Sequence, residues 1–143
     1  MYGTAIEKLL GGSDLIGHEI RNEMDLYEVS KAGLPKKALI NLVQNLGFTV
    51  KSMASIINIT ERTIQRKSDM ELFDNITSEQ ILQVADVYSR GNEVFGSSEN
   101  FNKWITMENK ALNGKKPIDL LSSRYGVEMV LDELGRIEYG ITA

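Results

Sequence analysis

The stretch from residue 49 to residue 67 predicts two short helices joined by one tight turn. Met53, Ala54 and Ile57 would share one face of the first helix, and the small side chain of Ala54 allows a second helix to cross closely. Asn58 stands at the turn, where asparagine tolerates the left-handed backbone conformation better than most residues do. This pattern is typical of a helix-turn-helix.

The second helix of this pair has one apolar side chain and an otherwise polar surface. Thr60 is placed to cap its first turn, and Ile64 would point to the core. The side chains left facing outward are Glu61, Arg62, Thr63, Gln65, Arg66 and Lys67. Such side chains can contact the base edges and phosphates of DNA. An ordinary helical hairpin with a solvated polar face is the alternative that the pattern leaves open.

Positive charge is concentrated around this stretch. Residues 31–67 hold seven basic residues against one acidic residue, a net charge of +6, whereas residues 1–30 carry −4 and residues 68–143 carry −6. The whole chain has a net charge of −4. A basic middle between acidic ends is expected of a DNA-binding unit joined to a unit with another task.

Composition excludes several kinds of site. With 143 residues, 42% of them hydrophobic, the chain can form one domain or two small ones. It has no cysteine, which excludes disulfides, thiolate metal sites and a cysteine nucleophile, and His18 is its only histidine. No glycine-rich phosphate loop or cluster of metal ligands is present, so we expect neither an enzyme nor a cofactor. No apolar run is long enough to span a membrane, and we expect a soluble, cytoplasmic protein.

The remaining patterns are also helical, and no strand-like alternation persists beyond a few residues, so the predicted fold class is all-α. Before the helix-turn-helix, helices are expected over residues 4–10, 22–32 and 35–46, the last bracing the helix-turn-helix. After it, a capping box that starts at Thr77 predicts a helix. The helices expected in this second half cover residues 77–95, 98–112, 117–121 and 126–139. The last one has the clearest periodicity, with an apolar stripe at Val127, Val130, Leu131, Leu134 and Ile137.

Seven segments in a fixed order carry a resemblance to a known family. They are Gly33-Leu-Pro, Arg62-Thr-Ile-Gln-Arg66, Val94-Phe-Gly96 with Trp104 eight residues on, Ala111-Leu-Asn-Gly114, Pro117-Ile-Asp-Leu-Leu121, Gly126, and Leu134-Gly-Arg-Ile-Glu-Tyr-Gly140. On these segments, which span about three quarters of the chain, the protein resembles the Xre/MbcA/ParS antitoxins that partner RES-domain toxins.

The resemblance implies a function and an organisation. The protein would be the antitoxin of a type II toxin-antitoxin pair. Its C-terminal domain would hold a RES toxin that consumes NAD, and the complex of the two proteins would repress its own promoter. The resemblance also implies a homodimer with two reading helices about 34 Å apart, one turn of operator DNA. The expected domains are an N-terminal extension (1–32), an Xre-like helix-turn-helix domain (33–75) and a small helical toxin-binding or dimerisation domain (76–143).

The resemblance also implies site residues. Those expected to contact the operator are Arg62, Thr63, Gln65 and Arg66, together with Lys51, Thr60 and Lys67. Those expected to contact the toxin lie in residues 134–143 and are Leu134, Arg136, Ile137, Tyr139, Gly140 and Ile141. Arg136 offers a planar donor fork, and Tyr139 offers a large amphipathic ring. A stand-alone helix-turn-helix repressor with a C-terminal dimerisation or effector domain is the alternative.

Overall fold

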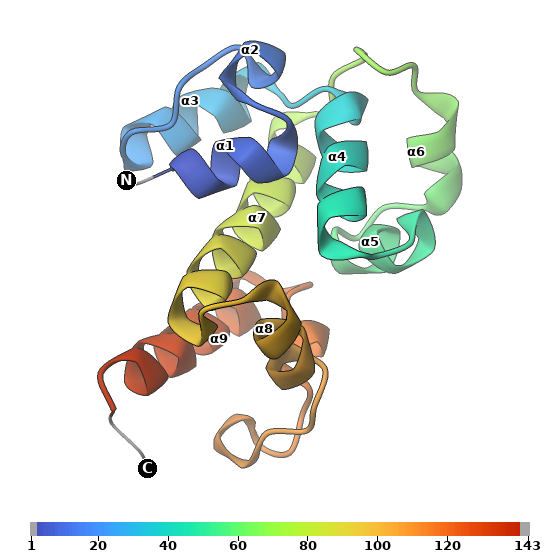
Figure 1. The fold of residues 1–143 in the computed structure, drawn as a ribbon. Coiled ribbons are helices and arrows are strands. Elements are labelled where there is room, and N and C mark those ends of the chain that lie inside the picture. The colour runs from blue at the N-terminus through green and yellow to red at the C-terminus, as the bar shows by residue number, and fades with distance from the viewer. Residues whose placement is uncertain (1–2, 141–143) are drawn as a thin grey trace. The chain divides into compact units, whose positions relative to one another are not determined.

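The computed structural model describes residues 3–140, and the regular elements in that range are all helices, as the sequence predicts (Figure 1). In chain order they are α1 (Thr4–Leu10), α2 (Ser13–Ile16), α3 (Glu23–Ala32), α4 (Lys36–Leu46), α5 (Val50–Ile56), α6 (Glu61–Arg66), α7 (Asn75–Phe95), α8 (Ser98–Ile105), the 3-10 helices η1 (Lys110–Leu112) and η2 (Pro117–Leu120), and α9 (Arg124–Glu138). Isolated bridges join Pro35 to Leu72 and Asn109 to Lys115.

The chain divides into two compact units, residues 1–85 and residues 86–143, so the division falls inside α7. We call them unit 1 and unit 2. The helix-turn-helix lies in unit 1, and α8 and α9 lie in unit 2. The functional division expected from the sequence, between residues 75 and 76, is at the start of α7 and stays a prediction.

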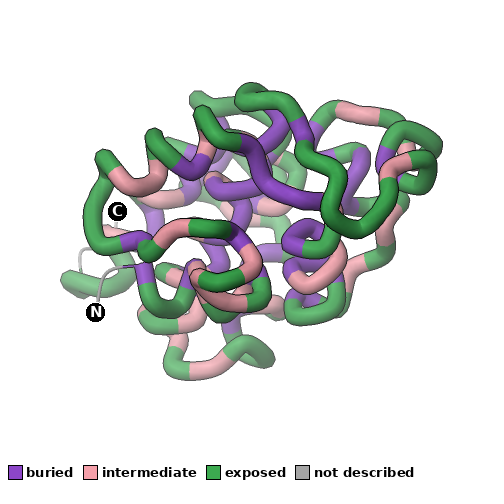
Figure 2. The backbone as a smooth tube through the Cα atoms, turned by 90° about the horizontal axis from the view of Figure 1, so that it is seen from above, coloured by how far each residue is buried: buried purple, intermediate pink, exposed green. Residues whose placement is uncertain are grey.

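Helix α4 is central to unit 1. Its predicted apolar stripe is buried, with Leu39 and Leu42 fully inaccessible and Val43 and Leu46 6% exposed. The helix packs against α1, α2 and α5, and it ends at Gly47, whose φ of 69° favours glycine. Along the helices in Figure 2, buried and exposed residues alternate as amphipathic helices require. The brace that the sequence predicts for the helix-turn-helix is therefore present.

The N-terminal segment is fastened to α4 by side-chain amides. Asn41 donates to the Leu10 carbonyl oxygen at 3.2 Å, and Asn45 donates to the Leu9 carbonyl oxygen at 3.0 Å. These bonds use the last carbonyl groups of α1, which have no partner within that helix. The first helices of the chain are thus part of unit 1.

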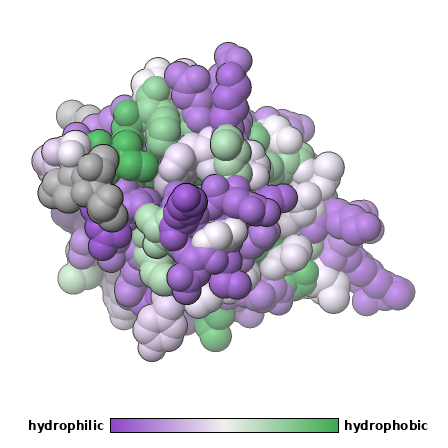
Figure 3. Space-filling view, turned by 90° about the horizontal axis from the view of Figure 1, so that it is seen from below, coloured by the Kyte–Doolittle hydropathy of each residue, from purple (hydrophilic) through white to green (hydrophobic). Residues whose placement is uncertain are grey.

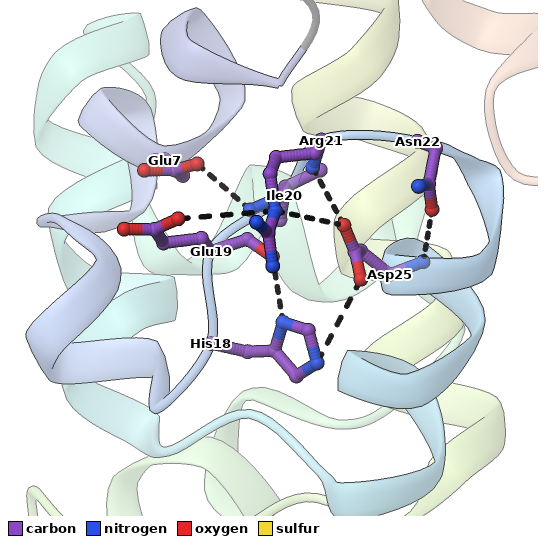
Figure 4. Close-up of polar contacts among 7 residues, drawn as sticks. All are labelled: Glu7, His18, Glu19, Ile20, Arg21, Asn22 and Asp25. Carbon is purple, nitrogen blue, oxygen red and sulfur yellow. Dashed lines mark hydrogen bonds and ion pairs between the residues drawn. The ribbon is translucent and has the colours of Figure 1, made fainter.

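A polar cluster joins α1 to the start of α3 (Figure 4). The Ile20 amide donates to the Glu7 carboxylate at 2.8 Å, and the Arg21 amide donates to the Asp25 carboxylate at the same distance. His18 lies 3.8 Å from Asp25. The single histidine of the chain is therefore one member of this cluster of local contacts.

The predicted start of α7 is wrong by two residues. The helix begins at Asn75, and the Asp74 carboxylate caps it by accepting from the Thr77 amide at 2.8 Å. Hydrogen bonds from Thr77 hold the pKa of Asp74 below its usual value, and the charge of Lys67 adds to the effect. In the first turn of this helix Ile76 is 64% exposed, whereas Ile81 is fully buried.

Aromatic rings form the centre of unit 2. Phe101 meets Tyr88 edge-on at 5.1 Å between ring centroids and stacks with Trp104 at 5.9 Å. A Cβ atom at Gly91 would lie 2.2 Å from the Phe101 ring, so the glycine inside α7 makes room for this ring. Trp104 is half-buried, so one large ring contributes to the core of this unit.

The predicted helix over residues 98–112 is interrupted. Helix α8 ends at Ile105, and a short hairpin follows in which the Asn109 amide donates to the Lys115 carbonyl oxygen at 3.0 Å. The Asn109 side chain caps η1 by accepting from the Ala111 amide at 2.8 Å. Asn113 and Gly114 form the turn of this hairpin, and both residues have positive φ.

Candidate nucleic-acid interface and partner surface

The predicted helix-turn-helix is present as α5 and α6. The Thr49 hydroxyl caps α5 by accepting from the Ser52 amide at 3.0 Å. Met53 and Ile57 are fully buried and Ala54 is 3% exposed, so the predicted inner face is confirmed. Asn58 has a φ of 61°, as the turn requires.

Helix α6 is held by its first residues and by one side chain. The Thr60 hydroxyl accepts from the Thr63 amide at 3.1 Å and lies 2.7 Å from the Thr63 hydroxyl. Ile64 is 1% exposed and is the buried residue of this six-residue helix. The two threonine hydroxyls expected at the operator therefore already form the cap of the helix.

The other polar side chains of α6 face outward. Arg62, Gln65 and Arg66 are exposed, and the Gln65 amide group donates to the Glu61 carboxylate at 3.1 Å. Arg62 and Arg66 are four residues apart, which places them on one face of the helix. Two exposed arginines on one short helix can hold phosphates or read guanine through a two-donor fork.

The two predicted lysine contacts differ in their surroundings. Lys51 is exposed on α5. Lys67, in contrast, has a side chain that is 20% exposed; its ammonium donates to the Leu72 carbonyl oxygen at 3.1 Å and lies 3.6 Å from the Glu71 carboxylate. The structure thus directs the charge of Lys67 toward oxygen atoms of the protein.

In unit 2, the predicted apolar stripe of α9 is largely inside. Val130 and Leu134 are fully buried and Val127 is 4% exposed, whereas Ile137 is 39% exposed. Gly126 allows the approach of η2, because a Cβ atom there would lie 1.9 Å from the Leu120 carbonyl oxygen. Leu134 is therefore a core residue, and we remove its side chain from the direct contacts expected from the sequence.

The opposite side of α9 carries exposed large side chains, which we call the outer face of α9. Tyr125 is 79% exposed, Met129 46% and Tyr139 77%, and Arg136 completes the set with a side chain that is 51% exposed. Their spacing of four, seven and three residues places them on one side of a helix. The sequence-based set of toxin contacts lacks Tyr125, although its spacing from Arg136 is a signal that could have identified it; Met129 is exposed, as a partner or dimer face on this helix requires.

Arg136 is oriented by a neighbour on its own helix. One guanidinium nitrogen lies 3.5 Å from the Glu133 carboxylate, and Glu133 is one of the few buried charged residues of the described chain. An arginine has five donor hydrogens in a fixed plane, so this contact leaves others for a partner. Gly140 follows with a φ of 70°, and the predicted contact Ile141 lies outside the described residues.

The described part of the chain has neither a metal-binding cluster nor a membrane-spanning helix. Among residues 3–140, no three His, Asp or Glu side chains gather in a way that could hold a metal ion. None of the helices in this range is long and apolar enough to cross a membrane. On the face in Figure 3, hydrophilic side chains are interspersed with smaller apolar areas.

Two family models match consecutive parts of the chain. Residues 25–86 match the antitoxin Xre-like helix-turn-helix domain, and residues 90–140 match the antitoxin Xre/MbcA/ParS C-terminal toxin-binding domain. The first range contains α5 and α6, and the second contains α8 and α9. None of the curated proteins compared with the sequence matches it significantly.

A solved structure shares the fold. The chain is similar to one in the crystal structure of the M. tuberculosis MbcT-MbcA toxin-antitoxin complex, with a TM-score of 0.54 and 16% sequence identity. The similarity covers 87% of this chain and all of the other chain. At this identity the similarity establishes the fold, and the assignment to a family rests on the two family models.

Proposed function

We propose that this chain, which belongs to the Xre/MbcA/ParS antitoxin family, is the antitoxin of a type II toxin-antitoxin pair. In this proposal, unit 2 binds and neutralises a RES-type toxin that consumes NAD. Helix α6 of unit 1 reads operator DNA, so that the pair represses its own operon. The protein itself is an inhibitor and regulator rather than an enzyme, and it acts in the cytoplasm.

The outer face of α9 is the observation that carries the toxin-binding part. It lies within the residues that match the toxin-binding domain model, and it exposes two tyrosines, a methionine and an arginine. Tyrosine and arginine are enriched among the residues that dominate binding energy in protein interfaces. We propose that Arg136, Ile137, Tyr139, Gly140 and Ile141 contact the toxin, and that Tyr125 and Met129 extend this contact.

Helix α6 supports the operator-binding part. Arg62 and Arg66 are exposed on one face, Gln65 lies beside them, and Lys51 adds a charge from α5. Thr60 and Thr63 hold the start of the helix in place. We propose that two copies of the chain associate and place two α6 helices about 34 Å apart, the spacing of adjacent major grooves on one side of DNA.

Toxin binding is tested with the product of the neighbouring reading frame and the Tyr139→Ala variant. Loss of an exposed anchoring ring is expected to weaken the complex about 30-fold, because such residues contribute roughly 2 kcal/mol or more to binding. Tyr27→Ala removes a tyrosine that is 54% exposed in unit 1 and is the matched control. The measurements are the dissociation constant by calorimetry and the NAD-consuming activity that remains in the mixture.

The toxin-binding proposal fails if the neighbouring product does not bind, or if Tyr139→Ala binds as well as Tyr27→Ala. Point variants are sharper here than deletion of residues 134–143. Such a deletion would remove the buried side chain of Leu134 and disturb the core of unit 2.

Operator binding is tested with a double variant, Arg62→Met with Arg66→Met. Affinity for the upstream DNA is expected to fall at least about 100-fold, since each good arginine contact with a base provides roughly 1–3 kcal/mol of discrimination. Lys115→Met with Lys116→Met removes the same charge from an exposed loop of unit 2 and is the control. Both double variants should still neutralise the toxin. If the wild-type protein represses the promoter but binds no toxin, it is a stand-alone repressor instead.

A further inference from the structure

Lys36, the first residue of α4, reaches the end of α6. Its ammonium donates to the Lys67 carbonyl oxygen at 2.8 Å and lies 3.5 Å from the Gln65 carbonyl oxygen. The last carbonyl groups of a helix have no partner within it and carry partial negative charge. A half-buried ammonium at this position therefore satisfies both the hydrogen-bonding and the electrostatic needs of the end of α6.

The backbone at the start of α4 holds the segment that follows α6. The Lys36 amide donates to the Glu71 carbonyl oxygen at 3.0 Å, and the Lys37 amide donates to the Asp69 carbonyl oxygen at 2.7 Å. These amides belong to the first turn of α4 and have no partner within that helix. The same residue, Lys36, thus joins α4 to the end of α6 through its side chain and to the next segment through its backbone.

Lys67 strengthens the same junction. Besides its contacts with Leu72 and Glu71, its ammonium lies 5.2 Å from the centroid of the Phe73 ring, and Phe73 is 4% exposed. An ammonium over an aromatic face is attracted to it. Lys36 and Lys67, both in the positive middle of the chain, therefore serve contacts within the protein.

Helix α6 depends on such contacts because it is short. A helix of six residues is too short to be stable alone in water. Ile64 is its one buried residue, so a single apolar side chain anchors the helix to the core of unit 1. The cap at Thr60 fixes one end, and the ammonium of Lys36 is positioned to fix the other.

We infer that Lys36 is a positioning residue for α6, which sets the direction of this helix from inside the protein without contacting DNA. Lys67 holds the segment that follows α6 through Glu71 and Leu72, and we infer that it does not contact the DNA phosphates. This inference deepens the proposed function and rests on operator binding for one of its two tests.

The first test needs no DNA. In full-length Lys36→Met, amide hydrogen exchange in α6 is expected to rise about tenfold, the effect of losing one charge-assisted hydrogen bond, whereas exchange in α7 stays at the wild-type rate. Lys36→Arg keeps a charged donor and should restore most of the protection. Unchanged exchange in α6, or a rise shared equally by α7, would overturn the positioning role.

The second test measures binding to operator and non-operator duplexes across a salt series. Lys36→Met should weaken operator binding about tenfold, leave non-operator binding within about twofold and keep the salt slope. Lys51→Met, at an exposed lysine, should lower the slope by about 0.9 and weaken both duplexes alike. A lowered slope in Lys36→Met would show a phosphate contact and refute the inference. If the wild type binds no DNA, the proposed operator function fails, and hydrogen exchange alone decides the role of Lys36.

Discussion

Helices α6 and α9 both present side chains to a proposed partner, yet they are held in place differently. Helix α6 has six residues and one buried side chain, and its two ends are secured by the Thr60 hydroxyl, which accepts from the Thr63 amide, and by the Lys36 ammonium, which donates to the Lys67 carbonyl oxygen. Helix α9 has fifteen residues, and its apolar stripe is buried along most of its length. Hydrogen bonds at its ends thus orient α6, whereas the packing of buried apolar side chains orients α9.

This difference determines which substitutions each surface tolerates. Close packing makes the stability of the fold sensitive to changes of side-chain volume on the inner side of α9. Substitutions on the outer face of α9 should leave that stability unchanged. The position of α6 depends on individual donors and acceptors, so the loss of a single polar contact far from its exposed arginines should alter it.

Gly126→Ala should have the largest effect and should act on unit 2. The new Cβ atom would lie 1.9 Å from the Leu120 carbonyl oxygen, a backbone atom that cannot move aside easily. We expect a loss of on the order of 4 kcal/mol in the free energy of unfolding, measured by denaturant titration, together with loss of toxin binding.

The control for this substitution is Gly135→Ala in the same helix. A Cβ atom there has no neighbour within 4 Å, so alanine should stabilise the protein by roughly 0.5–1 kcal/mol through its helix propensity. Equal effects of the two substitutions would contradict the view that packing on one side orients α9.

Ile64→Ala should release α6. Removing a buried isoleucine side chain costs about 3 kcal/mol, and here it removes the apolar anchor of the helix. Operator affinity should fall steeply in gel-shift titrations while toxin binding is kept. Ile76→Ala, at an isoleucine that is 64% exposed in the same unit, should change neither; if it weakens DNA binding as much as Ile64→Ala does, the anchoring role is wrong.

Asp74→Ala should have the smallest effect, about 1 kcal/mol at neutral pH, through loss of the cap of α7. The folded-state pKa of Asp74 is lowered, so its charge stabilises the fold above the ordinary aspartate pKa of about 4. That contribution is lost as the pH falls through the lower folded-state value. The difference from wild type in thermal melts should therefore shrink below about pH 4. Asp69→Ala is the control, and a difference independent of pH would contradict the capping role.

Local patterns predicted most of the helices. The turn at Asn58, the cap at Thr60 and the buried stripe of α4 follow from neighbouring residues, and the structure confirms them. The start of α7 was mispredicted because the Asp74 carboxylate, and not the capping box at Thr77, caps the helix: it accepts from the Thr77 amide at 2.8 Å. The next residue, Ser78, serves a tertiary contact, since its hydroxyl accepts from the Leu34 amide at 2.9 Å between segments 44 residues apart.

The candidate surfaces were predicted in part. Sequence patterns identified the exposed arginines of α6, Arg136 and Tyr139, because helical spacing shows which residues share a face. They placed Leu134 among the contacts, but it is fully buried, and they omitted Tyr125, which is exposed. Periodicity indicates that a stripe is buried, and packing decides how far along the helix the burial extends.

The sequence by itself determined the helical class and the helix-turn-helix, because these depend on spacing and on local turn chemistry, and its ordered segments carried the resemblance to the family. The tertiary structure alone decided that Lys36 holds the end of α6 and that Lys67 faces the protein. The bond between the Lys36 ammonium and the Lys67 carbonyl oxygen joins residues 31 positions apart. The sequence shows that a lysine carries a charge but does not identify its hydrogen-bond acceptor. The fold brings the acceptor, here a carbonyl oxygen from a distant segment, next to the ammonium.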